Sequence, residues 1–250
     1  MIPTLTEALI IIAAGLAAGF FNTIAGGGSL ISVPILIFMG LEPKVANASN
    51  RVALVAQNIS AVAGFKSKGI SDFPYSLWLG FAALPGAIVG AVLAEKIEGD
   101  LFNKILAVIM VGVVIYTVFQ RKPEQKEEAD MRPARKWLGY LAMFFIGFYG
   151  GFVQAGVGFI MIAALGNIHG LSLVRINAIK VFVVLIYTLA AVVTFIYLGI
   201  VNWYYGLILA IGNAAGGWIS SRLSVKKGDK FVRNIMLVTV IALAIKLWFF

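Results

Sequence analysis

The residues best suited to chemistry lie in a glycine-rich stretch between two apolar runs, residues 9–21 and 30–41. Three consecutive glycines weaken a helix, because each costs about 1 kcal/mol relative to alanine. If a second helix begins at Gly28 or Ser29, its first N–H groups are unpaired and carry partial positive charge. Such a helix start, with a serine hydroxyl beside it, is suited to bind an oxyanion. The candidate binding residues here are Asn22, Gly26, Gly27, Gly28 and Ser29.

A second break of the same kind lies in the other half of the chain, where residues 155–158 (Ala-Gly-Val-Gly) align with residues 25–28 (Ala-Gly-Gly-Gly). Paired interruptions at matching positions of two halves are typical of transporter binding sites. We therefore expect two helix N-termini to converge near the middle of the membrane. The alternative is that the glycines only permit tight turns or close helix contacts. The candidates at this break are Gln154, Gly156 and Gly158.

Two basic residues, Arg51 and Lys180, fall inside apolar segments at similar depths. An ionisable residue inside a membrane span is costly and by default indicates a function. We expect these cations to attract or bind an anion, either at one site or at two separate gates. The alternative is that each side chain extends to the nearer membrane surface. Asparagines on the same segments are further candidates, namely Asn47 and Asn177, which occupy equivalent positions, and Asn50.

These residues need membrane helices to position them. Of the 250 residues, 61% are hydrophobic and 12% are charged, whereas soluble domains are about 25% charged. Because apolar runs recur from end to end, we predict an all-α polytopic membrane protein. The ten expected helical segments are 5–22, 29–40, 45–65, 74–95, 101–119, 137–154, 159–168, 173–198, 203–222 and 231–250. Segments 29–40 and 159–168 are too short to cross a bilayer, so we expect half-helices that fold back from the glycine breaks.

The two halves of the chain repeat each other. The shift along the sequence that aligns the two breaks also aligns Gly69 with Gly199, and Gly86 with Gly216. Each half has five segments, an odd number, so the halves should lie upside down relative to each other. This pattern predicts two inverted-topology repeats whose glycine-broken hairpins meet near the midplane. We divide the chain into a first repeat at 1–119, a linker at 120–136 and a second repeat at 137–250, all within one membrane domain.

The basic residues indicate the orientation. Most of the Lys and Arg residues lie in the linker 120–136, around 222–233 and at 66–68. Because cytoplasmic loops are enriched in Lys and Arg, we place these links in the cytoplasm and both termini outside the cell membrane. The same distribution explains the net charge of +9 without nucleic-acid binding. The expected partners are a small anion and the lipid bilayer, and a homodimer is compatible with the sequence.

Other chemistries find little support. The chain has no cysteine and a single histidine, His169, which we expect in a short loop. We therefore expect no metal site and no cofactor. A phosphate-binding G-x-x-x-x-G-K-[ST] motif is absent, and the acidic residues fall at segment ends or in loops. These features predict that the protein is not an enzyme.

Four glycine pairs have the four-residue spacing that lets membrane helices approach closely. The pairs are Gly15/Gly19, Gly86/Gly90, Gly147/Gly151 and Gly212/Gly216. We expect these glycines to mark helix crossings and not binding residues.

The ordered set of motifs resembles the TauE/SafE family of sulfite and organosulfonate exporters over nearly the whole chain. The matching stretches are GFFNTIAGGGSL (19–30) leading to Pro34, ANASNR (46–51), GFVQAGVG (151–158), and NAIK (177–180) followed by 213–222. The resemblance implies transport of a small sulfur-containing anion, such as sulfite, thiosulfate or an organosulfonate. Together with the repeated breaks and the two cations inside apolar segments, it leads us to expect a secondary transporter or facilitator that works by alternating access. Many members have Thr-Ser at the position of Ser49-Asn50, which implies that ligand preference can differ. The alternatives are an anion channel of the same fold and a membrane partner protein that does not transport.

Overall fold

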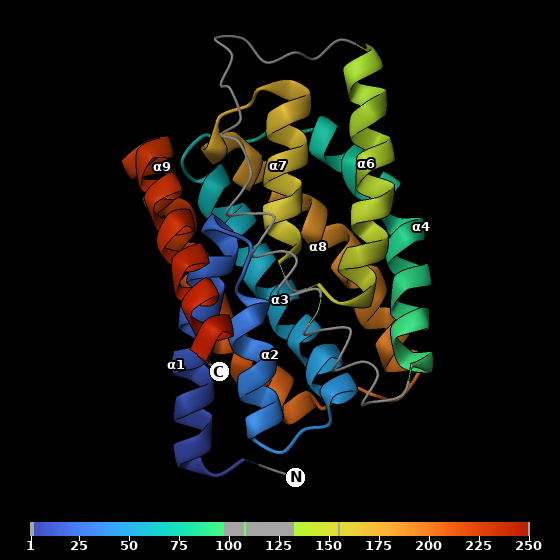
Figure 1. Cartoon of the computed structure of the whole chain (residues 1–250), viewed down its shortest axis with the longest axis vertical. Helices are drawn as coiled ribbons and strands as arrows, with labels where there is room; N and C mark the ends of the chain where they lie inside the picture. Colours follow the sequence, from blue (N-terminus) through green and yellow to red (C-terminus); the bar gives the residue numbers. More distant parts are fainter. Residues whose placement is uncertain (1–2, 98–107, 109–132, 155, 250) are drawn as a thin grey trace.

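The computed structural model describes residues 3–97, 108, 133–154 and 156–249, and every regular element in this part of the chain is an α-helix (Figure 1). The helices are α1 (Leu5–Ile24), α2 (Ser29–Phe38), α3 (Pro43–Lys66), α4 (Tyr75–Lys96), α6 (Pro133–Phe152), α7 (Val157–His169), α8 (Leu173–Tyr197) and α9 (Trp203–Phe249). The prediction of an all-helical protein is confirmed for these residues. Apart from residue 108, the predicted segment 101–119 lies outside the described residues, as does most of the linker 120–136.

Two helices are interrupted where the glycine-rich stretches lie. α1 ends at Ile24 and α2 begins at Ser29. Between them Gly26 has a φ of +89°, a left-handed conformation that glycine adopts without penalty and a helix cannot continue through. Gly156, with a φ of +75°, separates α6 from α7 in the same way. Figure 1 shows α2 in the lower half of the molecule and α7 in the upper half, so the two short helices extend in opposite directions from the middle.

The predicted glycine crossings are confirmed, and each one joins the two halves of the chain. α1 packs against α9, where a Cβ added to Gly15 would lie 2.6 Å from the carbonyl oxygen of Leu209. α4 packs against α6, where a Cβ added to Gly90 would lie 2.8 Å from the backbone nitrogen of Phe152. Backbone meets backbone at both crossings, which is the close approach that small residues permit between membrane helices.

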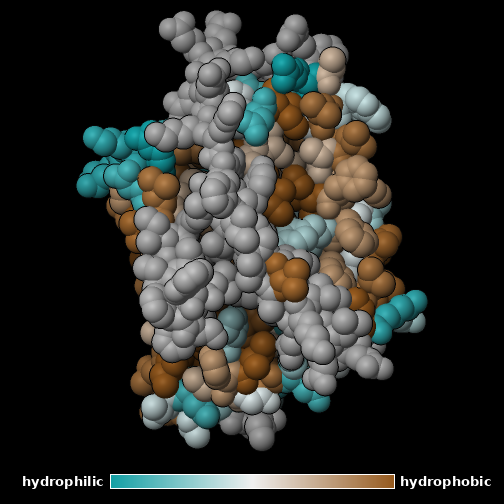
Figure 2. Space-filling model, viewed as in Figure 1, coloured by the Kyte–Doolittle hydropathy of each residue, from teal (hydrophilic) through white to brown (hydrophobic). Residues whose placement is uncertain are grey.

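The outer faces of the helices suit a lipid environment. By length and composition, three of the described helices could cross a membrane, namely Leu5–Ile24, Tyr75–Ala94 and Leu173–Tyr197. Large apolar side chains are exposed on them, including Leu9, Phe81 and Val193. Figure 2 shows apolar surface in brown between polar groups in teal toward the two ends. Exposed apolar surface on this scale indicates contact with a membrane or a partner, and the composition favours the membrane.

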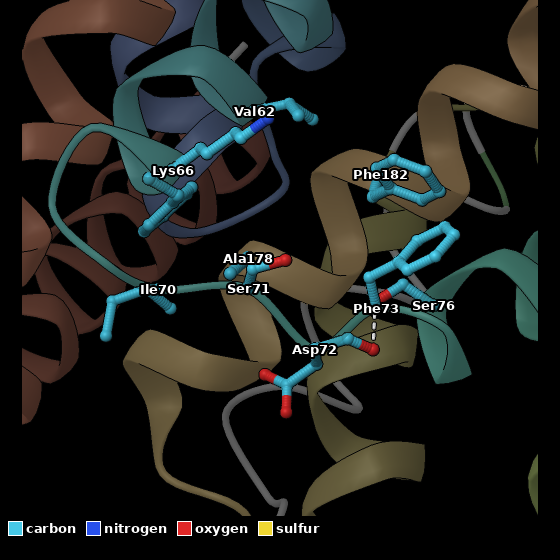
Figure 3. Close-up of a pocket in the computed structure, with 10 residues that line it drawn as sticks. Val62, Lys66, Ile70, Ser71, Asp72, Phe73, Ser76, Ala178 and Phe182 are labelled. Carbon is cyan, nitrogen blue, oxygen red and sulfur yellow. Dashed lines mark hydrogen bonds between the residues drawn. The ribbon is translucent and has the colours of Figure 1, made fainter.

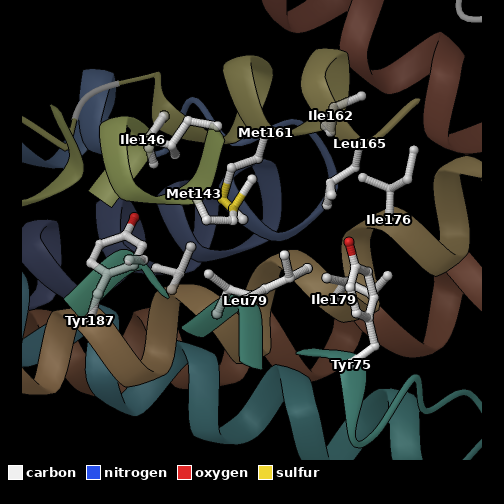
Figure 4. Close-up of a cluster of buried hydrophobic side chains, with 14 of the residues drawn as sticks. Tyr75, Leu79, Met143, Ile146, Met161, Ile162, Leu165, Ile176, Ile179 and Tyr187 are labelled. Atoms are coloured by element: carbon white, nitrogen blue, oxygen red, sulfur yellow. The ribbon is translucent and has the colours of Figure 1, made fainter. Parts of the chain in front are cut away.

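The short helices are held by burial inside the protein. α7 packs into an apolar cluster with α4, α6 and α8 (Figure 4), to which it contributes Met161 and Leu165. α2 belongs to a second cluster, in which Leu30 and Leu36 are buried together with Leu209 of α9. The side chains of other helices therefore surround these two helices, which are too short to span a bilayer by themselves.

Three boundaries differ from the prediction. Residues 133–136, assigned to the linker, already form the start of α6, because proline suits the first position of a helix. Residues 223–227, expected in a loop, are helical, and the helix is interrupted only at Gly228, whose φ is +73°. His169 is the last residue of α7 and not a loop residue, because the left-handed Gly170 ends the helix one position later.

Candidate functional site at the two helix breaks

The two glycine breaks touch each other. A Cβ added to Gly26 would lie 2.6 Å from the carbonyl carbon of Gly158, and a Cβ added to Gly158 would lie 3.2 Å from the backbone nitrogen of Gly26. Backbone therefore meets backbone, with no room for a side chain on either residue. The structure thus brings together two stretches that lie at matching positions of the sequence, and the starts of α2 and α7 are neighbours.

The side chain of Asn22 holds the start of α2 against α1. Its amide oxygen accepts a hydrogen bond from the N–H of Gly28 at 3.3 Å, and its amide nitrogen donates to Gln57 Oε1 at 3.1 Å. Gln57 donates in turn to the hydroxyl of Thr23 at 3.3 Å. Asn22 thus supplies a side-chain acceptor for an N–H group at a helix start, as a helix cap does.

A second set of hydrogen bonds joins α2 to α3. Asn50 donates its amide to Ser29 Oγ at 3.2 Å and accepts from Ser32 Oγ at 2.7 Å. At the same turn, the N–H groups of Gly27 and Ser29 have no acceptor among the described residues. N–H groups at a helix start carry partial positive charge, and within the described part of the chain these two are unpaired donors at the first break.

Arg51 is fully buried and points at the end of α6. Its Nη1 atom donates to the carbonyl oxygen of Gly150 at 2.5 Å and to Gln154 Oε1 at 2.6 Å. Its Nη2 atom donates to the carbonyl oxygen of Gly151 at 3.1 Å and to Asn47 Oδ1 at 3.4 Å. The structure therefore brings together Asn47, Arg51 and Gln154, three of the predicted site residues.

Lys180 is buried in an equivalent way at the end of α1. Its Nζ atom donates to the carbonyl oxygens of Asn22 and Thr23, at 3.1 and 2.8 Å, and to Asn177 Oδ1 at 2.7 Å. The exposed fractions of Lys180 and Arg51 are 2% and 0%, so the alternative that these side chains extend to the membrane surface is wrong. No carboxylate of the described residues pairs with either cation.

Two residues of this site, Tyr187 and Gln57, are missed by the sequence analysis. The hydroxyl of Tyr187 donates a hydrogen bond to Gln154 Oε1 at 3.1 Å. Gln154 itself has a left-handed backbone, with a φ of +68°. Gln57 plays the corresponding part beside Asn22 at the first break. The shift that aligns the two breaks also aligns Gln57 with Tyr187, so these residues occupy equivalent positions. Both residues can be found from the sequence by applying this shift to the polar residues of α3 and α8.

His169 is bonded inside the protein. Its Nε2 atom lies 2.7 Å from the hydroxyl of Tyr75, which joins the end of α7 to the first turn of α4. Tyr205, which the repeat aligns with Tyr75, donates to the carbonyl oxygen of Met39 at 3.4 Å. The far ends of both short helices are therefore held by a tyrosine from the other half of the chain.

A cavity of about 450 Å³ lies between the end of α3, the loop before α4, and α8 (Figure 3). Its lining residues are Val62, Phe65, Lys66, Ile70, Ser71, Asp72, Phe73, Ser76, Ala178 and Phe182. Most of the wall is apolar, and the rings of Phe73 and Phe182 meet edge to face with centroids 6.4 Å apart. No predicted site residue is among these lining residues, although Phe65 and Ala178 pack in the same cluster as Ile24 at the end of α1.

Beside this cavity, Arg175 at the start of α8 forms an ion pair with Asp72. The arginine uses both Nε and Nη2 to bond the carboxylate, whose side chain is 9% exposed. Because 45% of the arginine side chain is exposed, we still expect the small contribution of exposed pairs, about 1 kcal/mol or less. A double-mutant cycle of Asp72→Asn and Arg175→Gln, followed by thermal unfolding, should therefore give a coupling of at most about 1 kcal/mol. Arg233→Gln, at another exposed arginine, is the control. A coupling of about 3 kcal/mol would instead indicate a buried pair.

Comparisons with known proteins point to one family. A family model described as "Sulfite exporter TauE/SafE" matches residues 11–247. "Probable membrane transporter protein ORF9" from Sinorhizobium sp is 27% identical over 235 residues, which cover 94% of this chain and 89% of the relative. "Probable membrane transporter protein YfcA" from Escherichia coli (strain K12) is 27% identical over 248 residues, which cover 98% of this chain and 90% of the relative. "Probable membrane transporter protein YunE" from Bacillus subtilis (strain 168) is 21% identical over an alignment that covers 96% of this chain and 96% of the relative. No solved structure matches the chain.

Proposed function

Because the chain belongs to the TauE/SafE sulfite exporter family, we propose that it is a secondary transporter or facilitator for a small sulfur-containing oxyanion such as sulfite, thiosulfate or an organosulfonate. The observation that carries this proposal is the contact between the two glycine breaks beside N–H groups that have no acceptor among the described residues. The relatives are named membrane transporters, which makes transport, and not catalysis, the expected activity.

The charge around the breaks supports an anion as the ligand. Arg51 and Lys180 are buried without a carboxylate partner among the described residues. The starts of α2 and α7 add partial positive charge beside them. Uncompensated buried charge is costly, and a bound anion offsets that cost whereas a cation or a neutral molecule does not.

In this proposal the two halves, 1–119 and 137–250, form inverted repeats around the shared site, and the linker 120–136 joins them in the cytoplasm. Equivalent contacts that cross between the halves support it, since α1 packs on α9 as α6 packs on α4. Alternating access then consists of one half rocking against the other around the breaks. With this orientation, both termini lie outside the cell membrane, as the distribution of Lys and Arg favours.

Removing a single N–H group tests the binding site. Ser29 is the first residue of α2, the helix position at which proline is tolerated. Gly28 before it has a helical backbone, with φ of −61° and ψ of −34°, which proline disfavours, but glycine has no Cβ to add to the clash and can shift toward an extended ψ. Ser29→Pro should therefore fold yet bind the anion about tenfold more weakly or worse, because a hydrogen bond to a charged group is lost. The control, Ser29→Ala, keeps the N–H group, loses only the hydroxyl, and should bind more tightly than Ser29→Pro.

The measurement is thermal stabilisation of the purified protein by sulfite, thiosulfate, sulfate, sulfoacetate, taurine and phosphate. A ligand at 100 times its Kd adds about 2.7 kcal/mol to the free energy of unfolding. Flux into liposomes then separates the mechanisms, because a transporter shows trans-stimulation whereas a channel shows single-channel currents. The proposal is contradicted if no sulfur oxyanion stabilises the protein, or if Ser29→Pro binds thiosulfate as tightly as Ser29→Ala.

A further inference from the structure

The ends of α1 and α6 lie inside the protein, next to the starts of α2 and α7. The last four carbonyl groups of a helix have no partner within it, and they carry partial negative charge. A buried carbonyl group without a donor is destabilising, and it would also repel an anion bound at the adjacent helix start. The contacts of these carbonyl groups therefore decide whether an anion can bind at the breaks.

All four of the last carbonyl groups of α1 have a donor. The carbonyl oxygen of Phe21 accepts from the N–H groups of Ala25 and Gly26. The next three carbonyl oxygens accept from two side chains of α8. These bonds are Lys180 Nζ to Asn22 at 3.1 Å, Lys180 Nζ to Thr23 at 2.8 Å, and Asn177 Nδ2 to Ile24 at 2.9 Å.

The end of α6 has the same pattern, with α3 in place of α8. The carbonyl oxygen of Tyr149 accepts from the N–H of Val153 at 2.9 Å. The bonds to the next three carbonyl oxygens are Arg51 Nη1 to Gly150 at 2.5 Å, Arg51 Nη2 to Gly151 at 3.1 Å, and Asn47 Nδ2 to Phe152 at 3.3 Å. At both ends, the cation and the asparagine lie about one turn apart on a helix from the opposite half of the chain, and they are bonded to each other.

We propose that Arg51 and Lys180 are positioning residues, each of which caps the broken helix of the opposite half so that an anion meets only the positive helix starts. This inference rests on the proposed function and replaces the expectation that both cations bind the anion directly. A lysine ammonium has three N–H donors, and all three of Lys180 have acceptors. Arg51 uses its four Nη protons in the same way, and only its Nε has no acceptor among the described residues.

The anion-free protein separates a cap from a direct ligand. If Lys180 is a cap, Lys180→Met leaves two buried carbonyl groups without donors, and the melting temperature without any oxyanion should fall by about 5 °C or more. If Lys180 serves only to bind the anion, removing an unpaired buried cation should leave this temperature unchanged or raise it. Lys66→Met is the matched control, since Lys66 is an exposed lysine in the last turn of a helix, and it should shift the melting temperature by less than about 2 °C.

Variants that retain N–H donors distinguish a positioning role in transport from a purely structural role. Lys180→Gln keeps two donors and loses the charge, so it should retain most of the melting temperature, while the KM for thiosulfate flux into liposomes rises about tenfold with Vmax little changed. Arg51→Gln should raise KM in the same way, but it keeps only two donors for four acceptors, so its melting temperature should fall further than that of Lys180→Gln. Lys180→Arg keeps both the charge and the donors, so its KM should stay close to that of the wild type.

Two results would contradict the proposal that Arg51 and Lys180 are caps. One is an anion-free Lys180→Met protein at least as stable as the wild type. The other is an unchanged KM in both glutamine variants. Stabilisation of the wild type by thiosulfate tests the proposed function separately, because the anion-free melting temperatures need no ligand.

Discussion

Replacing Gly26 with alanine is expected to reduce oxyanion transport about a hundredfold, whereas the same replacement at Gly40 is expected to spare it. The two glycines have nearly the same left-handed backbone, with φ of +89° and +90°, so alanine costs each about 1–2 kcal/mol. An added Cβ at Gly40 meets no atom within 4 Å, but at Gly26 it would lie 2.6 Å from the carbonyl carbon of Gly158. The difference between the two variants therefore isolates the contact between the breaks.

The clash at Gly26 cannot be relieved by a side-chain rotation, because the nearest atoms all belong to the backbone of Gly158. The starts of α2 and α7 must move apart, and a misplacement of about 1 Å can cost a hundredfold in rate. At equal amounts of folded protein, we expect about a hundredfold less thiosulfate flux into liposomes for Gly26→Ala and at most about a threefold loss for Gly40→Ala. Equal losses in the two variants would show that the contact between the breaks is not needed for transport.

The second large effect is expected where α4 crosses α6. A Cβ on Gly90 would lie 2.8 Å from the backbone nitrogen of Phe152, and a Cβ on Gly151 of the facing helix would lie 2.7 Å from Ala87 Cα. Leucine at position 90 therefore has to push the two helices apart, at an overpacking cost of about 3 kcal/mol or more. We expect Gly90→Leu to lower the melting temperature by about 6–12 °C or to prevent folding altogether.

Val89→Leu is the matched control for this crossing. Val89 lies on the same helix with 57% of its surface exposed, so the added methylene group faces outward. We expect this variant to melt within about 2 °C of the wild type. Thermal unfolding and size-exclusion chromatography in detergent measure both variants. If Gly90→Leu has the same melting temperature as Val89→Leu, the helices do not need this close approach.

Much of the framework around the site can be predicted from the sequence, because it depends on short stretches of chain. Apolar runs of membrane length predict the helices, and glycine clusters predict where helices stop, as they do at Gly26 and Gly156. The four-residue spacing of glycine pairs predicts close crossings, and Gly15 and Gly90 confirm it. The alignment of the two halves also selected Asn47, which the structure places beside Arg51.

What each polar side chain contacts could not be predicted in this way. Arg51 and Lys180 look alike in sequence, as cations in apolar segments, and an anion is the simplest partner to expect for them. Their acceptors are carbonyl groups that lie 99 and 158 residues away along the chain, at Gly150 and Asn22. No local pattern indicates such an acceptor, because every residue has a carbonyl group and only the helix ends leave it unpaired.

The sequence by itself determined that this protein is helical, suited to a membrane, and broken by glycines at two equivalent places. Hydropathy and helix propensity act over a few neighbouring residues, so these features do not depend on the rest of the fold. Only the tertiary structure decided that the breaks meet at Gly26 and Gly158, and that the two buried cations bond to the helix ends beside them. Both depend on how helices from opposite halves of the chain cross, and the free energy of that packing is not contained in any short segment.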